Sequence, residues 1–397
     1  MAAPLIVIAG ALANKPFNGG EAWVRLSWVR GFSGLGCRVA FLEEIDAATC
    51  VDDMGHATSP EASVNRRWFD DVVRAFGLED RSSLWCQNRS VTGLREADLQ
   101  DLLHDADLLV NISGNLTVPE LRNACGRRVY VDIDPGYTQL WAANGLAGSR
   151  LEGHQVYVTI GSNIGTNTCS IPTNGVTWLH VLPPVVLEDW PANLAAAFGQ
   201  TSTNSGDSTR FTTVATWRGP YGPIHWDGRQ LGSKVHQFRA FASLPSRARG
   251  CFEMALAIDP HEHADRSLLA AQGWSVVDPA PAAGTVDAFR RYVQGSAAEF
   301  SVAQEMYVAT HSGWFSDRST RYLASGKPVL VQDTGFSRTL PVGKGLLAFT
   351  TMEDAVAGAQ SIVEDYPTHA AAARRLAEEY FDSNLVLPGF LERVGLP

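Results

Sequence analysis

The sequence predicts an α/β protein of two Rossmann-like, doubly wound domains that face each other across a central cleft. Three observations carry this prediction. They are a length of 397 residues, short apolar runs that alternate with helix-like segments, and a polar stretch near the middle of the chain. Apolar runs without polar alternation are typical of parallel strands buried on both faces. A chain of this length is enough for two ordinary domains, each with its own core.

The polar stretch sets the domain boundaries. Residues 189–208 end in small polar residues without periodicity, which is the composition of a linker. We therefore expect an N-terminal domain over residues 1–188 and a C-terminal domain over residues 209–366, followed by a helical segment over residues 367–397.

At least five strands are predicted in the N-terminal domain. The runs that suggest them are residues 5–9, 38–42, 108–112, 128–134 and 157–160. The first and second are joined by a loop and a helix, as in a doubly wound unit. The first strand is not followed by Gly-x-Gly-x-x-Gly, so a dinucleotide oxidoreductase is disfavoured.

In the C-terminal domain, the stretch around Gly313 joins a predicted strand at residues 307–310 to a predicted helix over residues 317–325. A helix N-terminus after a strand can bind an anion, because free backbone N–H groups and the positive dipole end point at one place. We predict a phosphate or diphosphate ligand, and the alternative is an ordinary turn with a serine N-cap. The side chains available to the ligand are Ser316, His311 and Arg318.

This stretch resembles the donor-binding motif of GT-B glycosyltransferases. His311-Ser-Gly-Trp-Phe-Ser316 is similar to the His-x-Gly-Trp-x-Ser segment that holds the diphosphate of a nucleotide sugar in that superfamily. The run that ends in Gly-Lys-Pro-Val-Leu-Val-Gln332-Asp333 resembles the strand that brings an Asp/Gln pair to the sugar hydroxyls. Many members have Glu three residues after the motif serine, where it binds ribose; this chain has Ser319.

The resemblance implies roles for individual residues. His311, Gly313 and Ser316 would contact phosphate, and Gln332 and Asp333 would bind the sugar. Other donor-binding candidates in the same segment are Trp314, Asp317 and Arg318.

Further donor contacts are implied outside the motif. Arg218 follows the first strand of the C-terminal domain and Lys234 starts the next helix, positions that often contact the diphosphate in this superfamily; the alternative is two solvated charges. The nucleobase would lie near Asp278, with Glu299 close by. The final helix would cross back onto the N-terminal domain, with a kink at Pro388.

Two glycines before the first helix, Gly19 and Gly20, resemble the N-terminal glycine loop of several GT-B families. In those families the loop approaches the donor phosphates or the acceptor. A loop that needs glycine flexibility is the alternative.

A sugar transfer that inverts the anomeric carbon needs a base for the acceptor oxygen. Asp134 and Asp132 are the first candidates, because they end a predicted strand at the edge where open α/β sheets bind ligands. Period-two alternation predicts that both point to the same side, and a close pair of carboxylates can raise one pKa. Glu21 and His154 are weaker candidates. The alternatives are an Asp134-Pro-Gly turn and a Glu21 that only charges the helix start.

Composition limits the partners. A net charge of −10 disfavours nucleic acid, which needs a basic face. The six Cys residues form no Cys-x-x-Cys pair, so we expect reduced thiols, no zinc site and a cytoplasmic protein. No run is long enough to span a membrane.

The resemblance therefore implies a hexosyltransferase-type enzyme that moves a sugar from a nucleotide-diphosphate sugar to a small-molecule acceptor. It would need no cofactor and no metal ion. Two alternatives keep the fold: a nucleotide-sugar epimerase or hydrolase, and a non-catalytic nucleotide-sugar binding protein.

Overall fold

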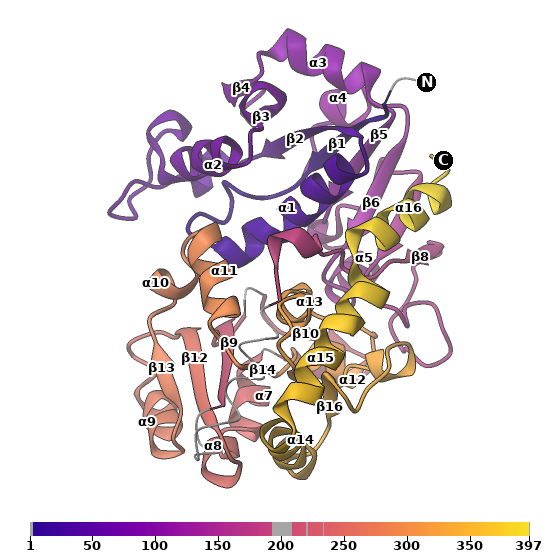
Figure 1. Ribbon diagram of the computed structural model, residues 1–397. Coiled ribbons are helices and arrows are strands. Elements are labelled where there is room, and N and C mark those ends of the chain that lie inside the picture. Colours follow the sequence, from indigo (N-terminus) through magenta and orange to yellow (C-terminus); the bar gives the residue numbers. More distant parts are fainter. Residues whose placement is uncertain (1–2, 193–208, 220, 233, 397) are drawn as a thin grey trace.

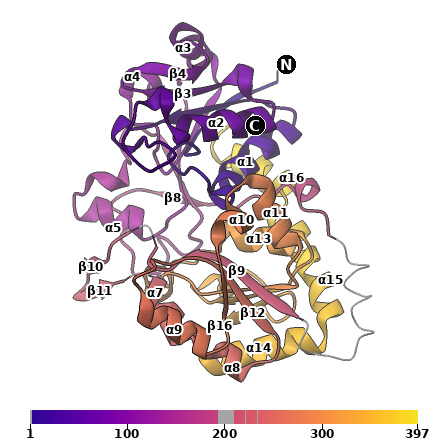
Figure 2. The same ribbon diagram turned by 90° about the vertical axis from the view of Figure 1, so that its left-hand side faces the viewer.

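Two mainly parallel sheets, each covered by helices, form the frame of the protein in a computed structural model (Figure 1, Figure 2). The structure describes residues 3–192, 209–219, 221–232 and 234–396. Most of the predicted linker, residues 193–208, lies outside the described residues.

The first sheet has eight strands within the described residues, in the order β4-β3-β2-β1-β5-β6-β7-β8. All neighbours are parallel except β3 and β4. Its strands are β1 Leu5–Ala9, β2 Arg38–Glu44, β3 Ser82–Cys86, β4 Arg89–Gly93, β5 Leu108–Ile112, β6 Arg128–Asp132, β7 Val156–Thr159 and β8 Trp178–His180. Helices of this half are α1 Gly19–Gly34, α2 Val64–Ala75, α3 Glu96–Asp105, α4 Pro119–Arg122 and α5 Tyr137–Ala143.

The second sheet has six parallel strands in the described part of the chain, in the order β13-β12-β9-β14-β15-β16. They are β9 Arg210–Thr216, β12 Cys251–Ala257, β13 Ser275–Val277, β14 Ala298–Ser301, β15 Val329–Gln332 and β16 Leu346–Phe349. A small antiparallel hairpin, β10 Ile224–Trp226 and β11 Arg229–Leu231, belongs to neither sheet. The helices are α7 Lys234–Ala240, α8 Leu244–Arg247, α9 His263–Ala271, α10 Pro279–Ala283, α11 Val286–Gln294, α12 Glu305–Ala309, α13 Asp317–Ala324 and α14 Met352–Glu364.

In both sheets the chain order reverses beside a central strand: β1 lies between β2 and β5, and β9 lies between β12 and β14. Open α/β sheets bind ligands at the carboxyl ends of the strands next to such a reversal. The predicted α/β class with two Rossmann-like halves is confirmed. The exact domain boundaries stay a prediction.

The C-terminal segment crosses from one half to the other. Helix α15, Tyr366–Leu376, is continued by a π-helical turn at Ala377–Phe381 and then by α16, Ser383–Arg393, which contains Pro388. Figure 1 shows α15 along the second sheet and α16 beside the first. Helix α16 packs on α1, and the ring centroids of Phe390 and Trp28 lie 5.2 Å apart.

One local prediction is wrong. Residues 307–310 were expected to be a strand. Residues 307–309 belong to the short helix α12, and Thr310 caps its C-terminus. The last strand before α13 is β14. Met306 and Tyr307 of α12 are buried in an apolar cluster with Tyr137 and Leu140 of α5. This packing outweighs the preference of a short β-branched run for a strand.

Helix α1 joins the two halves. The indole Nε1 of Trp23 donates to the carbonyl oxygen of Val286 at 2.9 Å, and α1 packs against α11. A Cβ atom on Gly19 would lie 2.1 Å from the carbonyl oxygen of Thr285, and one on Gly20 would lie 3.0 Å from the ring of Phe289. Close backbone contact between the halves therefore explains why glycine stands at the start of this helix.

No helix among the described residues has both the length and the apolar character needed to cross a membrane.

Two alanine substitutions in α1 test the contact between the halves. Gly19→Ala should lower stability by about 1–3 kcal/mol, because the added methyl group overlaps a backbone carbonyl that cannot move freely. Gly34→Ala is the matched control, since a Cβ there has no neighbour within 4 Å. It should be neutral or stabilising by up to about 1 kcal/mol. Thermal unfolding measures both, and equal melting temperatures would contradict the proposed contact.

Candidate active site

A large cavity of about 1220 Å³ is lined by loops from both halves of the protein. The N-terminal half contributes loops that follow β1, β2, β3, β5 and β6. The C-terminal half contributes residues after β9, the start of α7, α10 with the start of α11, and the segment from α12 to α13. The residues proposed from the sequence that line this cavity are Gly20, Glu21, Asp134, Lys234, Trp314, Ser316, Asp317 and Arg318.

The N-terminus of α13 opens into the cavity. Ser316 is its N-cap residue and is only 7% exposed, yet its side chain makes no capping hydrogen bond. The first backbone N–H groups of a helix have no partner within the helix. In the described structure, neither a loop carbonyl nor a side chain accepts from those of Asp317, Arg318 and Ser319. These N–H groups and the Ser316 hydroxyl are available to an anion.

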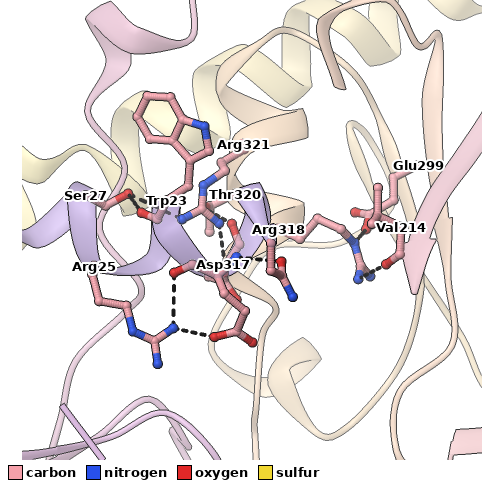
Figure 3. Close-up of polar contacts among 11 residues, drawn as sticks. Trp23, Arg25, Ser27, Val214, Glu299, Asp317, Arg318, Thr320 and Arg321 are labelled. Atoms are coloured by element: carbon pink, nitrogen blue, oxygen red, sulfur yellow. Dashed lines mark hydrogen bonds and ion pairs between the residues drawn. The ribbon is translucent and has the colours of Figure 1, made fainter. Parts of the chain in front are cut away.

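Arg318 lines the cavity, but its guanidinium is bound by the protein (Figure 3). Nε donates to Glu299 Oε1 at 2.7 Å and Nη1 donates to the carbonyl oxygen of Val214 at 2.9 Å. Nη2 donates to the hydroxyl of Ser301. Glu299 is fully buried and does not line the cavity. The pair therefore fixes α13 to β14 and β9, and neutralises the positive charge of Arg318.

Asp317 is neutralised in a similar way. Its carboxylate pairs with Arg321 of the next turn, a side chain that is 1% exposed. The same guanidinium reaches the hydroxyl of Ser27 in α1 at 3.4 Å, as Figure 3 shows. The first turn of α13 is thus tied to the helix that joins the halves.

Among the described residues of the C-terminal half, the basic side chains that line the cavity are Arg318 and Lys234, and Lys234 remains available. It begins α7, lines the cavity and forms no ion pair within the described residues. Its Nζ lies 5.3 Å from the ring centroid of Phe238. Burial, together with the charge of Arg318, lowers the pKa of Lys234 to about 7. An anion bound beside Lys234 would favour its charged form.

Across the cavity, Asp134 presents a carboxylate after β6. Its Oδ1 accepts a hydrogen bond from the hydroxyl of Tyr307 at 3.0 Å, and its Oδ2 accepts from that of Tyr221 at 3.3 Å. Burial, together with the nearby charges of Glu21 and Asp132, raises the pKa of Asp134 to about 6. A carboxylate with such a pKa is a suitable general base near neutral pH.

Asp132 does not reach the cavity. Its side chain is fully buried and accepts hydrogen bonds from Thr138, Gln139 and Thr159, each at 2.8 Å. The backbone N–H of Asp134 also donates to it, at 3.0 Å. Burial raises the pKa of Asp132, although these donors oppose that effect. Asp132 holds the loop that presents Asp134.

Glu21, the third proposed catalytic residue, lines the cavity and pairs with Arg25 one turn later. Burial raises its pKa, but Arg25 and Lys15 outweigh burial and leave the pKa of Glu21 below its ordinary value. It therefore stays ionised, as expected of an acidic residue in the first turn of a helix. His154 does not line the cavity, and burial lowers its pKa to about 4.

Three residues predicted to contact phosphate lie elsewhere. Arg218 is held at the surface by Glu262. His311 is exposed with φ of 49°, and its carbonyl oxygen accepts from Asn163. Gly313 has φ of 74°, and a Cβ there would lie 2.3 Å from the Ser162 hydroxyl, so it packs against the N-terminal half.

The predicted sugar- and base-binding residues also hold neighbouring loops. Gln332 bonds to the N–H of Ala303 and to Gln237. The carboxylate of Asp333 accepts from the N–H of Gly335 and from the hydroxyl of Ser337. Asp278 caps α10, whose residues Pro279 and Ala280 line the cavity instead.

Residues that the sequence did not single out complete the site. Tyr221 follows β9 and carries no motif signal, whereas Tyr307 belonged to a segment expected to be a strand. The buried carboxylate of Glu43 accepts from the N–H groups of three residues in the loop after β1. A glutamate directly after the apolar run at residues 39–42 was the available signal for that role.

Comparisons with known proteins identify the fold. No protein-family model matches the sequence, and no curated protein matches it. Among solved structures, HepE of Anabaena in complex with UDP-glucose aligns over 98% of this chain and 99% of its own, with a TM-score of 0.57 and 10% identity. The sucrose-phosphate synthase of Thermosynechococcus elongatus aligns over 99% and 98%, with a TM-score of 0.54 and 12% identity.

A third similar structure is an alpha-glucosyltransferase in complex with UDP and a 13-mer DNA containing an HMU base. It aligns over 99% of this chain and 100% of its own, with a TM-score of 0.55 and 12% identity. The chain has the GT-B fold. At these identities the likeness concerns the arrangement of the two halves around the cleft.

Within the described part of this GT-B chain, no group of three or more His, Cys, Asp or Glu side chains could hold a metal ion. Transfer without a metal ion stays a prediction.

Proposed function

We propose that this GT-B protein is a glycosyltransferase that moves a sugar from a nucleotide-diphosphate sugar to a small-molecule acceptor without a metal ion. The observation that carries the proposal is the arrangement of the cavity. Within the residues that the structure describes, an unpartnered helix N-terminus and an unpaired lysine line it from one half, and a carboxylate with a raised pKa lines it from the other.

The donor would bind with its diphosphate at the N-terminus of α13. The free N–H groups, the Ser316 hydroxyl and Lys234 would stabilise the charge that develops on the leaving diphosphate. The complexes of similar folds with UDP and UDP-glucose support this choice of ligand class.

The acceptor would bind between this site and Asp134. Asp134 would take the proton of the acceptor hydroxyl as its oxygen bonds to the anomeric carbon and the bond to the diphosphate breaks. The net charge of −10 favours a small molecule over a nucleic acid as acceptor.

Ser316→Ala tests the diphosphate site. UDP affinity, measured by calorimetry, should fall about fivefold, the effect of one lost hydrogen bond of about 1 kcal/mol. The control is Ser325→Ala, which removes a buried hydroxyl at the other end of the same helix. Equal UDP affinity in the Ser316 variant and the native protein would place the diphosphate elsewhere.

Lys234 should make UDP binding depend on pH. With its pKa near 7, the lysine is charged below that pH and must take up a proton on binding above it. UDP affinity should therefore fall by up to about tenfold per pH unit above about pH 7. Lys234→Arg, which stays charged, should remove this dependence. A pH-independent affinity in the native protein would contradict the proposed contact.

Asp134→Asn tests the proposed base. The variant keeps the shape of the side chain but cannot accept the proton, so transfer should slow by roughly two to four orders of magnitude while UDP affinity is unchanged. Release of UDP from a UDP-sugar in the presence of an acceptor is the assay. Release that does not need acceptor would favour the hydrolase alternative, and near-normal transfer would exclude Asp134 as the base.

A further inference from the structure

The hydrogen bonds of Asp134 come from the other half of the protein. Tyr307 lies in α12 and Tyr221 lies between β9 and β10, whereas Asp134 follows β6 of the first sheet. Each tyrosine donates to a different carboxylate oxygen. In the described structure no other side chain or backbone N–H donates to this carboxylate.

We propose that Tyr307 is a positioning residue that holds Oδ1 of Asp134, and that Tyr221 is a gate whose hydroxyl is replaced on Oδ2 by the hydroxyl of the acceptor. The inference rests on the proposed function of Asp134 as general base. It adds two residues to the site and states how the acceptor reaches the base.

The two tyrosines differ in how firmly they are held. Tyr307 is 1% exposed, its ring packs on Trp314 with centroids 4.6 Å apart, and Gln304 Nε2 lies 3.4 Å from its oxygen. Trp314 belongs to the segment that leads into α13. The residue that orients the base is therefore packed on the segment proposed to bind the diphosphate.

Tyr221 is held more loosely. It is half-buried and lines the cavity, and its bond to Asp134 is the longer of the two, at 3.3 Å. The centroid of its ring lies 4.8 Å from the ring centroids of Tyr137 and Trp141. An acceptor hydroxyl that replaces the phenol keeps the number of hydrogen bonds to Oδ2 unchanged, so the exchange leaves no buried acceptor without a donor.

Both phenols remain donors at neutral pH. Burial and the charge of Asp134 raise the pKa of Tyr307 well above its ordinary value. The charge of Asp134, followed by burial, raises that of Tyr221. Neither tyrosine can therefore serve as the base in place of Asp134.

Several groups from different elements face Asp134. Glu21 and Arg25 come from α1 and Asp132 comes from β6, in addition to the tyrosines. The charges of Glu21 and Asp132 raise the pKa of Asp134, whereas the Tyr307 hydrogen bond and Arg25 lower it. Removal of the Tyr307 hydroxyl should therefore move ionisation of the base to higher pH.

An NMR titration of the full-length protein with ¹³C-labelled aspartate carboxyls tests the role of Tyr307 without any need for turnover. The Asp134 signal is assigned by its loss in Asp134→Asn. We expect its midpoint near pH 6 in the native protein. It should rise by roughly half to one pH unit in Tyr307→Phe, the effect of one hydrogen bond. In Tyr221→Phe the rise should be smaller.

Tyr137→Phe is the matched control, because this tyrosine of the same cluster donates to Gln304 Oε1 and not to Asp134. It should leave the midpoint within a small fraction of the Tyr307→Phe shift. An unchanged midpoint in Tyr307→Phe would overturn the positioning role. An equal rise of the midpoint in Tyr307→Phe and Tyr137→Phe would also overturn it. Because no substrate is present, this outcome is independent of whether the protein transfers sugar.

Kinetics test the gate. In the transfer assay, Tyr221→Phe should lower KM for the acceptor several-fold and leave UDP affinity unchanged, since the acceptor no longer competes with a phenol. A several-fold rise in acceptor KM would overturn the gate. UDP affinity equal to that of the native protein shows that each variant is folded.

Discussion

The contact of α1 with the C-terminal half is the constraint on which the site depends. Gly19 meets the backbone of Thr285, and the indole of Trp23 bonds to Val286. The guanidinium of Arg321 in α13 donates to the hydroxyl of Ser27, which also lies in α1. Because α1 begins at the loop after β1 and α13 begins at the proposed diphosphate site, these contacts set the distance between the two walls of the cavity.

The electrostatics of the cavity follow from which charges the protein already neutralises. Glu299 neutralises Arg318 and Arg321 neutralises Asp317, so the wall around α13 has little free side-chain charge. The helix N-terminus and Lys234 then dominate the field at this wall. On the opposite wall, burial and two neighbouring acids keep Asp134 easy to protonate. One wall therefore suits an anionic leaving group and the other suits proton removal.

Local signals in the sequence predicted what depends on local structure. Ser316 as N-cap, Lys234 at a helix start and Asp134 after a buried strand all lie where the pattern put them. The prediction failed where long-range packing decides. Residues 307–310 are not a strand, because Met306 and Tyr307 of α12 pack on α5, an element far away in the sequence.

Contacts between distant segments also decide which residues face the cavity. Gly313 is needed for its close approach to Ser162, and Tyr221 reaches Asp134 from a loop without a motif.

The central claim is that one cavity holds the diphosphate at α13 opposite Asp134. A crystal structure with an intact UDP-sugar tests it most directly. The account predicts diphosphate oxygens within hydrogen-bond distance of the N–H groups of residues 317–319, with the sugar towards Asp134. A diphosphate bound at Arg218 or His311, with Ser316 and Lys234 free, would contradict it.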